Sequence, residues 1–214
     1  VKELHAGWGK TAPDVLRGAS LKLYPGEIYA VIGGNGSGKS TLLKTISGIL
    51  KPTGGRVKMR RNAVTAYLPQ EPCLLFSKET VGEEAPREML ERFALDGLSD
   101  RDPLDLSGGE RQKLALAKLL AGKPDILLLD EPTKGTDAAA RSAMSRMLRE
   151  LSAAGTAVLL VTHDAEFAVD TADICGMLFN GAMINEAPPS EMFRQNYFYT
   201  TPMSRLRRGI IEKE

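Results

Sequence analysis

A glycine-rich loop between a β-prone run and a helix-forming segment constrains this chain more than any other feature. Residues 33–41 read GGNGSGKST; they follow the apolar run Ile28–Ile32 and precede apolar residues at helical spacing over 40–50. This satisfies the G-x-x-x-x-G-K-[S/T] pattern in the strand–loop–helix context that the pattern requires. Glycines let backbone amides turn toward phosphate oxygens, and the helix N-terminus adds a favourable dipole. The segment therefore predicts a phosphate-binding loop, with a merely flexible glycine turn as the alternative.

The polar side chains of this loop have separate expected tasks. Lys39 supplies positive charge to the β- and γ-phosphates, the Ser40 hydroxyl ligates Mg²⁺, and Thr41 supports the α-phosphate. The rest of the expected phosphate cradle consists of Gly33, Asn35, Gly36, Ser37 and Gly38.

A second possible anion site lies at residues 106–110, which read LSGGE directly before a strong helical pattern. We expect the nucleotide-binding atoms there to come from Ser107, Gly108, Gly109 and Glu110, through a hydroxyl and amides at a helix N-terminus. A single bound nucleotide does not require two such sites in one chain, but a pair of chains facing head to tail does, because each site can close on the γ-phosphate held by the opposite loop. An ordinary helix cap is the alternative.

Taken in order along the chain, these motifs resemble the ABC ATPases, and the resemblance covers nearly the whole chain. Leu106–Glu110 resembles the ABC signature, usually L-S-G-G-Q, with Glu110 in place of the glutamine. The resemblance implies ATP and Mg²⁺ as cofactors and ATP hydrolysis as the activity.

Two apolar strands end in residues that resemble the catalytic elements of this family. Ile126–Leu129 leads into Asp130 and Glu131, where the resemblance implies that Asp130 holds Mg²⁺ and Glu131 orients and deprotonates the attacking water. His163 follows the run Ala157–Thr162 and resembles the switch histidine that contacts the γ-phosphate and links it to Glu131. Helix-capping acids and a structural histidine are the alternatives.

Three further residues match family positions at the nucleotide. Gln70 resembles the Q-loop residue that reaches Mg²⁺ and water, and a surface glutamine after a turn is its alternative. Trp8 occupies the place where relatives stack an aromatic ring on adenine, although tryptophan is also a good core filler. Asp137 resembles the D-loop aspartate that contacts the opposite subunit, with Thr136 standing where leucine is usual.

Apolar runs that alternate with helical patterns place the chain in the α/β class. Uninterrupted hydrophobic strands separated by helices, such as the pattern at 138–153, are what a parallel sheet buried on both faces requires. The resemblance implies a P-loop NTPase (RecA-like) core with a mainly parallel sheet and a small antiparallel β subdomain.

The middle of the chain predicts a small helical lobe. Residues 71–105 are richer in Pro, Gly and charge, with one helix expected over Val81–Phe93. With 214 residues, we expect a single domain over 1–214, with a core of about 1–70 and 106–214.

Composition excludes other classes. Charge is balanced at 28 basic and 27 acidic residues, so no global field attracts nucleic acid. Cys73 and Cys175 lie in no metal-binding pattern, which suits a reducing cytoplasm. Apolar runs are far shorter than the about 20 residues of a membrane-spanning helix. A start at Val1 instead of Met suggests a module of a longer polypeptide.

The C-terminal third resembles energy-coupling factor ATPases, most like the second cassette of the fused type. The residues that carry this likeness are 163–168 (HDAEFA), 172–175 (ADIC), 193–201 (FRQNYFYTT) and the basic run 205–208. The aromatic segment 193–201 is equally compatible with simple packing over the core.

This likeness implies a set of partners at the cytoplasmic face of the cell membrane. They are a second ATP-binding cassette, identical or different and possibly in the same polypeptide, a transmembrane coupling protein, and a membrane protein that captures a vitamin or metal ion. No nucleic-acid partner is expected. The alternatives are a soluble ABC ATPase acting on nucleic acid or ribosome, and a regulatory module that hardly hydrolyses ATP.

Overall fold

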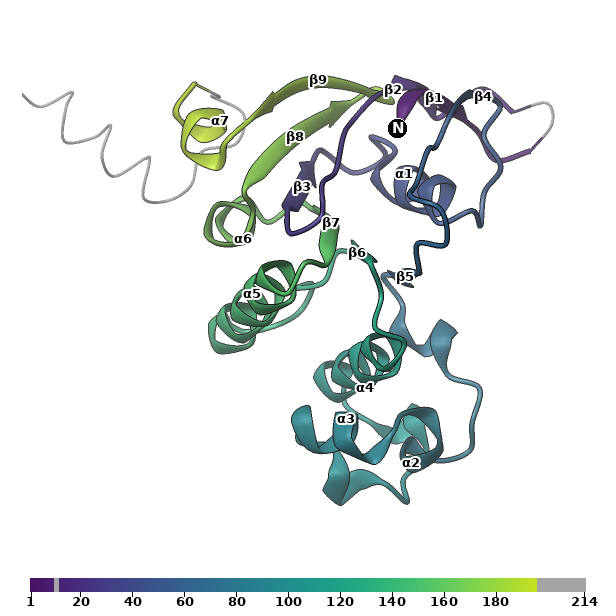
Figure 1. Cartoon of the computed structure of the whole chain (residues 1–214), viewed down its shortest axis with the longest axis vertical. Helices are drawn as coiled ribbons and strands as arrows, with labels where there is room; N and C mark the ends of the chain where they lie inside the picture. Colours follow the sequence, from purple (N-terminus) through teal and green to yellow (C-terminus); the bar gives the residue numbers. More distant parts are fainter. Residues whose placement is uncertain (10–11, 196–214) are drawn as a thin grey trace, which may run out of the picture.

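The computed structural model describes residues 1–9 and 12–195 as an α/β fold with two sheets and a helical lobe (Figure 1). The expected fold class is confirmed. The strands are β1 (Lys2–Ala6), β2 (Leu16–Ala19), β3 (Ile28–Ile32), β4 (Gly54–Arg56), β5 (Thr65–Leu68), β6 (Ile126–Asp130), β7 (Ala157–Thr162), β8 (Ile174–Phe179) and β9 (Ala182–Ala187). The helices are α1 (Lys39–Ile46), α2 (Val81–Glu84), α3 (Arg87–Arg92), α4 (Gly108–Ala121), α5 (Ala138–Ala153), α6 (Ala165–Thr171) and α7 (Pro189–Gln195), with short 3₁₀ turns at Pro72–Leu75, Asp96–Leu98 and Pro103–Asp105.

The main sheet has the strand order β5-β6-β7-β3-β8-β9, and all its pairs are parallel except β8 with β9. The smaller sheet, β2-β1-β4, is antiparallel. In the parallel register Ile32 pairs with Thr162 and Asp130 pairs with Val161. The ends of β3, β6 and β7 therefore meet at one edge of the sheet, which is where ligands bind in this class of fold.

Each buried strand supplies side chains to both faces of the sheet. In β3, Ile28, Ala30 and Ile32 join the core on the side of α5 and α6, whereas Tyr29 and Val31 join the core on the side of α1. This explains why these strands are apolar without interruption. The two cores hold the loop after β3 on a rigid base.

The helical lobe contradicts one expectation. The single helix predicted over Val81–Phe93 is wrong: α2 ends at Glu84, Ala85 is extended with φ −146°, and α3 begins after Pro86. A proline disfavours helical geometry at the residue before it, so the helix breaks there. The lobe has its own small core, which it shares with α4, and Figure 1 shows α2 and α3 at the end of the molecule remote from β1 and β2.

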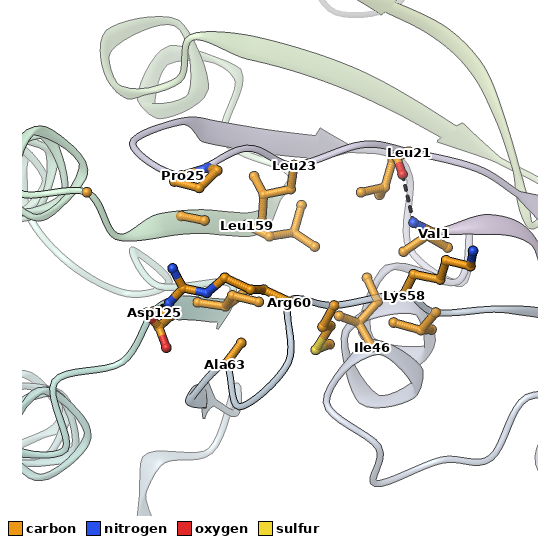
Figure 2. A pocket seen from close by; sticks show the side chains of 15 residues that line it. Val1, Leu21, Leu23, Pro25, Ile46, Lys58, Arg60, Ala63, Asp125 and Leu159 are labelled. Carbon is orange, nitrogen blue, oxygen red and sulfur yellow. Dashed lines mark hydrogen bonds and ion pairs between the residues drawn. The ribbon is translucent and has the colours of Figure 1, made fainter.

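An apolar cavity of about 190 Å³ lies near the opposite, amino-terminal ends of β6 and β7 (Figure 2). Leu23 and Leu159 form part of its wall, and an ion pair of 2.5 Å joins Arg60 to Asp125 at its border. The phosphate-binding loop belongs to the other edge of the sheet, so this hollow is separate from the predicted chemistry.

Two expectations concern the C-terminal part of the chain. Phe193, on α7, is buried in the main core, in agreement with a packing role for that residue. Residues 196–201 and the basic run 205–208 lie outside the described residues. Within the described ranges, no helix has the length and apolarity needed to cross a membrane.

Candidate functional site

The glycine-rich loop adopts a conformation that its glycines make possible. Gly36 and Gly38 have φ of +76° and +106°, and Gly38 is the residue before α1. A side chain at either position is strained, because L-residues rarely adopt positive φ. The loop thus turns the start of α1 toward the edge of the sheet, as a phosphate site requires. Among residues 1–9 and 12–195, the buried Ser37 hydroxyl has no hydrogen-bond partner, which leaves a free polar group within the loop.

Lys39 lies almost fully buried at the base of this loop. Its Nζ donates hydrogen bonds to the carbonyl oxygens of Gly33 (2.9 Å) and Gly34 (3.2 Å). It is also 3.8 Å from Oε1 of Glu131. A positive charge is thereby fixed between the loop and the end of β6, where a triphosphate's charge is expected.

Ser40 and Asp130 meet directly. The Ser40 hydroxyl donates to Oδ1 of Asp130 at 3.0 Å, and the Tyr67 hydroxyl donates to Oδ2 at 3.2 Å. Burial raises the pKa of Asp130, and the two hydroxyl hydrogen bonds oppose that rise. A hydroxyl and a single carboxylate are hard oxygen donors, a set that suits Mg²⁺, which takes its remaining ligands from water and substrate phosphates. The residue types therefore fit the expected metal.

Glu131 is held in an unusual backbone conformation with φ +52°. Its Oε2 lies 2.8 Å from Nδ1 of His163 and 3.3 Å from both the His163 amide and the Thr162 hydroxyl. A non-glycine residue in this region costs of order 1 kcal/mol or more, and such strain gathers at functional sites. The strand ends therefore bring the two predicted catalytic residues into contact.

Trp8 is not a core filler, since 53% of it is exposed. Its Nε1 donates to the Thr41 hydroxyl at 3.2 Å, and Nζ of Lys44 lies 4.9 Å from the ring centroid. The ring is thus fixed beside the phosphate-binding loop, which leaves the predicted adenine contact open to test.

A cavity of about 900 Å³ joins most of the predicted site. Its lining contains Trp8, Gly33, Asn35, Gly36, Gly38, Lys39, Ser40, Thr41, Gln70, Glu131 and His163. Val15, Gly34 and Lys134 also line it without having been predicted as site residues. Tyr67 and Thr162 were missed as well, because their contacts depend on strand order, and no spacing in the sequence gives that order.

The segment 107–110 does not line this cavity; residues 107–109 are exposed and Glu110 is half-buried. Ser107 caps α4, and Oε2 of Glu110 accepts from the Ser107 amide (2.8 Å) and hydroxyl (2.7 Å). These hydrogen bonds lower the pKa of Glu110. Asp137 likewise caps α5 through the Ala140 amide and is exposed. Neither element lines this cavity of its own chain.

The family model for ABC transporters matches residues 16–134, more than half of the chain. The chain belongs to the ABC transporter ATP-binding family. Cassettes of this family bind ATP, with Mg²⁺ as the usual cofactor, and hydrolyse it. The chain is therefore an ATP-binding cassette and an ATPase.

Individual relatives agree with this assignment. A putative ABC transporter ATP-binding protein of Bacillus thuringiensis is 38% identical over 92% of this chain, and the match spans only 40% of that relative's length. The energy-coupling factor transporter ATP-binding protein EcfA of Methanothermobacter thermautotrophicus is 36% identical over 84% of this chain and 67% of its own.

Two solved structures are also similar. CbiO1 of Clostridium perfringens, described as part of the ABC transporter complex cbiONQ, has a TM-score of 0.78 at 26% identity, covering 97% of this chain and 92% of its own. A dimeric ATP-binding cassette in a post-hydrolysis state with ADP and Pi has a TM-score of 0.79 at 26% identity, covering 88% and 97%.

Proposed function

We propose that this cassette powers an energy-coupling factor importer for a vitamin or metal ion from the cytoplasmic face of the cell membrane. The observation that carries its catalytic part is the contact between Glu131 and His163 beside Lys39 at the head of the phosphate-binding loop. Likeness to EcfA and to CbiO1 supports the transporter type.

In this proposal the loop and Lys39 bind the triphosphate, and Trp8 stacks on the adenine. Ser40 and Asp130 hold Mg²⁺, assisted by Gln70, and the ion neutralises phosphate charge when bound. Glu131 takes the proton of the attacking water through a carboxylate that His163 and Thr162 hold in place. The γ-phosphate leaves with the oxygen of that water, and ADP retains the β-phosphate.

The signature segment completes a second chain's site. Ser107 and the amides at the start of α4 are exposed, so a facing protomer can present its γ-phosphate to them. Asp137, also exposed, contacts that protomer near its phosphate loop. ATP thus bridges two cassettes, and hydrolysis removes the bridge and lets them separate.

The remaining partners follow from this motor role. They are another ATP-binding cassette, a transmembrane coupling protein and a substrate-capturing membrane protein. This chain acts as the second cassette of a fused pair. Residues 1–214 form one domain, with a lobe over about 71–105. Relatives more than twice as long as the match support a module within a longer polypeptide.

The test is to isolate the full natural protein from detergent-solubilised membranes and to identify its subunits by mass spectrometry, with phosphate release measured on the same sample. We expect two membrane proteins in fixed ratio and ATP hydrolysis that depends on Glu131. Stable association with ribosomes or nucleic acid, without any membrane protein, would contradict the proposed importer function. Absence of phosphate release from the intact complex would contradict the motor role.

A further inference from the structure

Tyr67 is the one aromatic side chain described here that touches the expected metal-binding carboxylate. It lies on β5, beside β6, and its hydroxyl donates to Oδ2 of Asp130 at 3.2 Å. The ring packs against the core on the side of α1. Neither the phosphate-binding loop nor the signature requires a tyrosine at this place.

The two oxygens of Asp130 have different partners. Oδ1 accepts from Ser40 and Oδ2 accepts from Tyr67, and within the described ranges these are the side chains whose hydrogen bonds hold the carboxylate. Asp130 is 3% exposed, so water cannot readily replace a lost donor. The Tyr67 hydroxyl therefore fixes the rotation of the carboxylate and keeps Oδ1 turned toward Ser40.

We propose that Tyr67 is a positioning residue for the divalent cation of this ATPase. Ser40 and Asp130 offer the ion its oxygen ligands, and Tyr67 acts through Asp130 by anchoring the oxygen that faces away from Ser40. Removal of its hydroxyl lets the carboxylate rotate and weakens cation binding. The inference rests on the proposed function, because it needs Ser40 and Asp130 to hold the ion.

Tyr67→Phe tests this, because it removes one oxygen and retains the ring. Mn²⁺ serves as the probe: its binding to the protein with a non-hydrolysable ATP analogue is measured by the loss of the free-ion electron paramagnetic resonance signal. We expect Mn²⁺ affinity to fall about tenfold, the scale of a hydrogen bond to a charged group. Binding of the analogue in the presence of EDTA, followed by the fluorescence of Trp8, the chain's single tryptophan, should be unchanged.

Tyr29→Phe is the matched control. Tyr29 is fully buried, whereas Tyr67 is half-buried, and the Tyr29 hydroxyl likewise donates to a carboxylate, Oε2 of Glu186 at 2.9 Å. We expect this variant to lower the urea midpoint of unfolding and to leave Mn²⁺ affinity unchanged. Equal loss of Mn²⁺ affinity in both variants would overturn the inference, because packing would then explain the effect.

Asp130→Asn separates this inference from the proposed function. Loss of Mn²⁺ binding in Asp130→Asn, together with normal affinity in Tyr67→Phe, would overturn only the positioning role. Normal Mn²⁺ affinity in Asp130→Asn would overturn the metal site of the proposed function, and the role of Tyr67 with it. We expect Mn²⁺ binding to be lost in Asp130→Asn, weakened in Tyr67→Phe and unchanged in Tyr29→Phe.

Discussion

Nδ1 of His163 lies 2.8 Å from Oε2 of Glu131, and the other carboxylate oxygen of Glu131, Oε1, lies 3.8 Å from Nζ of Lys39. The side chain of Glu131 is 10% exposed, whereas that of His163 is 58% exposed. The carboxylate of Glu131 is thus anchored through one oxygen by an exposed ring and faces the Lys39 ammonium with the other. Such an arrangement fixes the direction from which a water molecule can be deprotonated.

Replacement of Glu131 by glutamine should abolish turnover and preserve nucleotide binding. An amide keeps the shape of the side chain but accepts no proton, and general-base catalysis contributes typically about 10²–10⁴-fold. We expect phosphate release to fall by at least about 100-fold while Trp8 fluorescence still reports ATP binding. Glu88→Gln, an exposed charge change on α3, serves as control and should retain full activity. Unchanged turnover in Glu131→Gln would remove this residue from the role of base.

Replacement of His163 by alanine should also lower turnover, by acting on the same carboxylate. The loss of its ring leaves Oε2 of Glu131 with the His163 amide and Thr162 at 3.3 Å, both weaker contacts. If the pair acts as a unit, the double variant His163→Ala/Glu131→Gln should be no slower than Glu131→Gln alone. If the rate of single-turnover phosphate release in the double variant falls by the product of the two single-variant factors, the two residues act independently.

Much of this site follows from the sequence because its motifs are local. Strand, glycine loop and helix are consecutive around Lys39, and the proposed base, Glu131, directly follows an apolar strand, so short-range patterns predict both. The order of β5, β6 and β7 is not local, which is why the contacts of Tyr67 and Thr162 were missed.

The errors in the fold have two different origins, one local and one non-local. One helix was expected over 81–93, yet Pro86 forces Ala85 into extended geometry and divides it. Strand β9 was not predicted, because half of its residues are exposed and it has no continuous apolar run. Polar, half-exposed strands obtain their stability from pairing with a neighbour, and a single sequence does not show that neighbour.

Replacement of Glu110 by glutamine should favour the ATP-bound dimer. The Glu110 carboxylate now accepts from the Ser107 amide and hydroxyl, the groups that the proposed dimer offers to the facing γ-phosphate. These hydrogen bonds lower the pKa of Glu110, so it remains charged at neutral pH and competes with that phosphate. In the Glu131→Gln background, we expect the ATP concentration for half-maximal dimerisation to fall about two- to fivefold by sedimentation.

Asp105→Asn removes an equal charge a few residues away without a contact to Ser107, and it should shift dimerisation less. An equal shift in both variants would assign the effect to net charge alone. No shift in Glu110→Gln would show that the carboxylate does not compete at this site.

The stability of the helical lobe should depend on pH through Glu84. Its fully buried side chain accepts from the amides of Ser77 and Lys78 and from Nζ of Lys118 at 2.5 Å. Burial alone raises the pKa of Glu84, but the Lys118 and amide hydrogen bonds outweigh it, and the net pKa is lowered. A lowered folded-state pKa means that the stabilisation is complete above the unfolded value of about 4.3 and is lost as the pH falls through the folded value.

Glu84→Gln should therefore lower the free energy of unfolding by about 1–3 kcal/mol at pH 7, with a difference from wild type that shrinks below about pH 4. Urea unfolding as a function of pH measures it. Glu91→Gln, which breaks the exposed pair with Arg87, is the control and should cost less than about 0.5 kcal/mol. A pH-independent difference between Glu84→Gln and wild type would contradict the charge-based explanation.

The two adjacent glycines that open the phosphate-binding loop should respond differently to alanine. A Cβ at Gly33 would lie 2.5 Å from the carbonyl oxygen of Leu178 and 2.7 Å from Oγ of Ser37, whereas a Cβ at Gly34 would meet nothing within 4 Å. The first of these neighbours is backbone of β8, which cannot move without disturbing the sheet. Gly33→Ala should therefore lower the free energy of unfolding by about 1–3 kcal/mol without nucleotide present, and Gly34→Ala should leave it nearly unchanged. Equal unfolding midpoints in the two variants would mean that β8 does not confine the loop, and that its conformation is set by Gly36 and Gly38 alone.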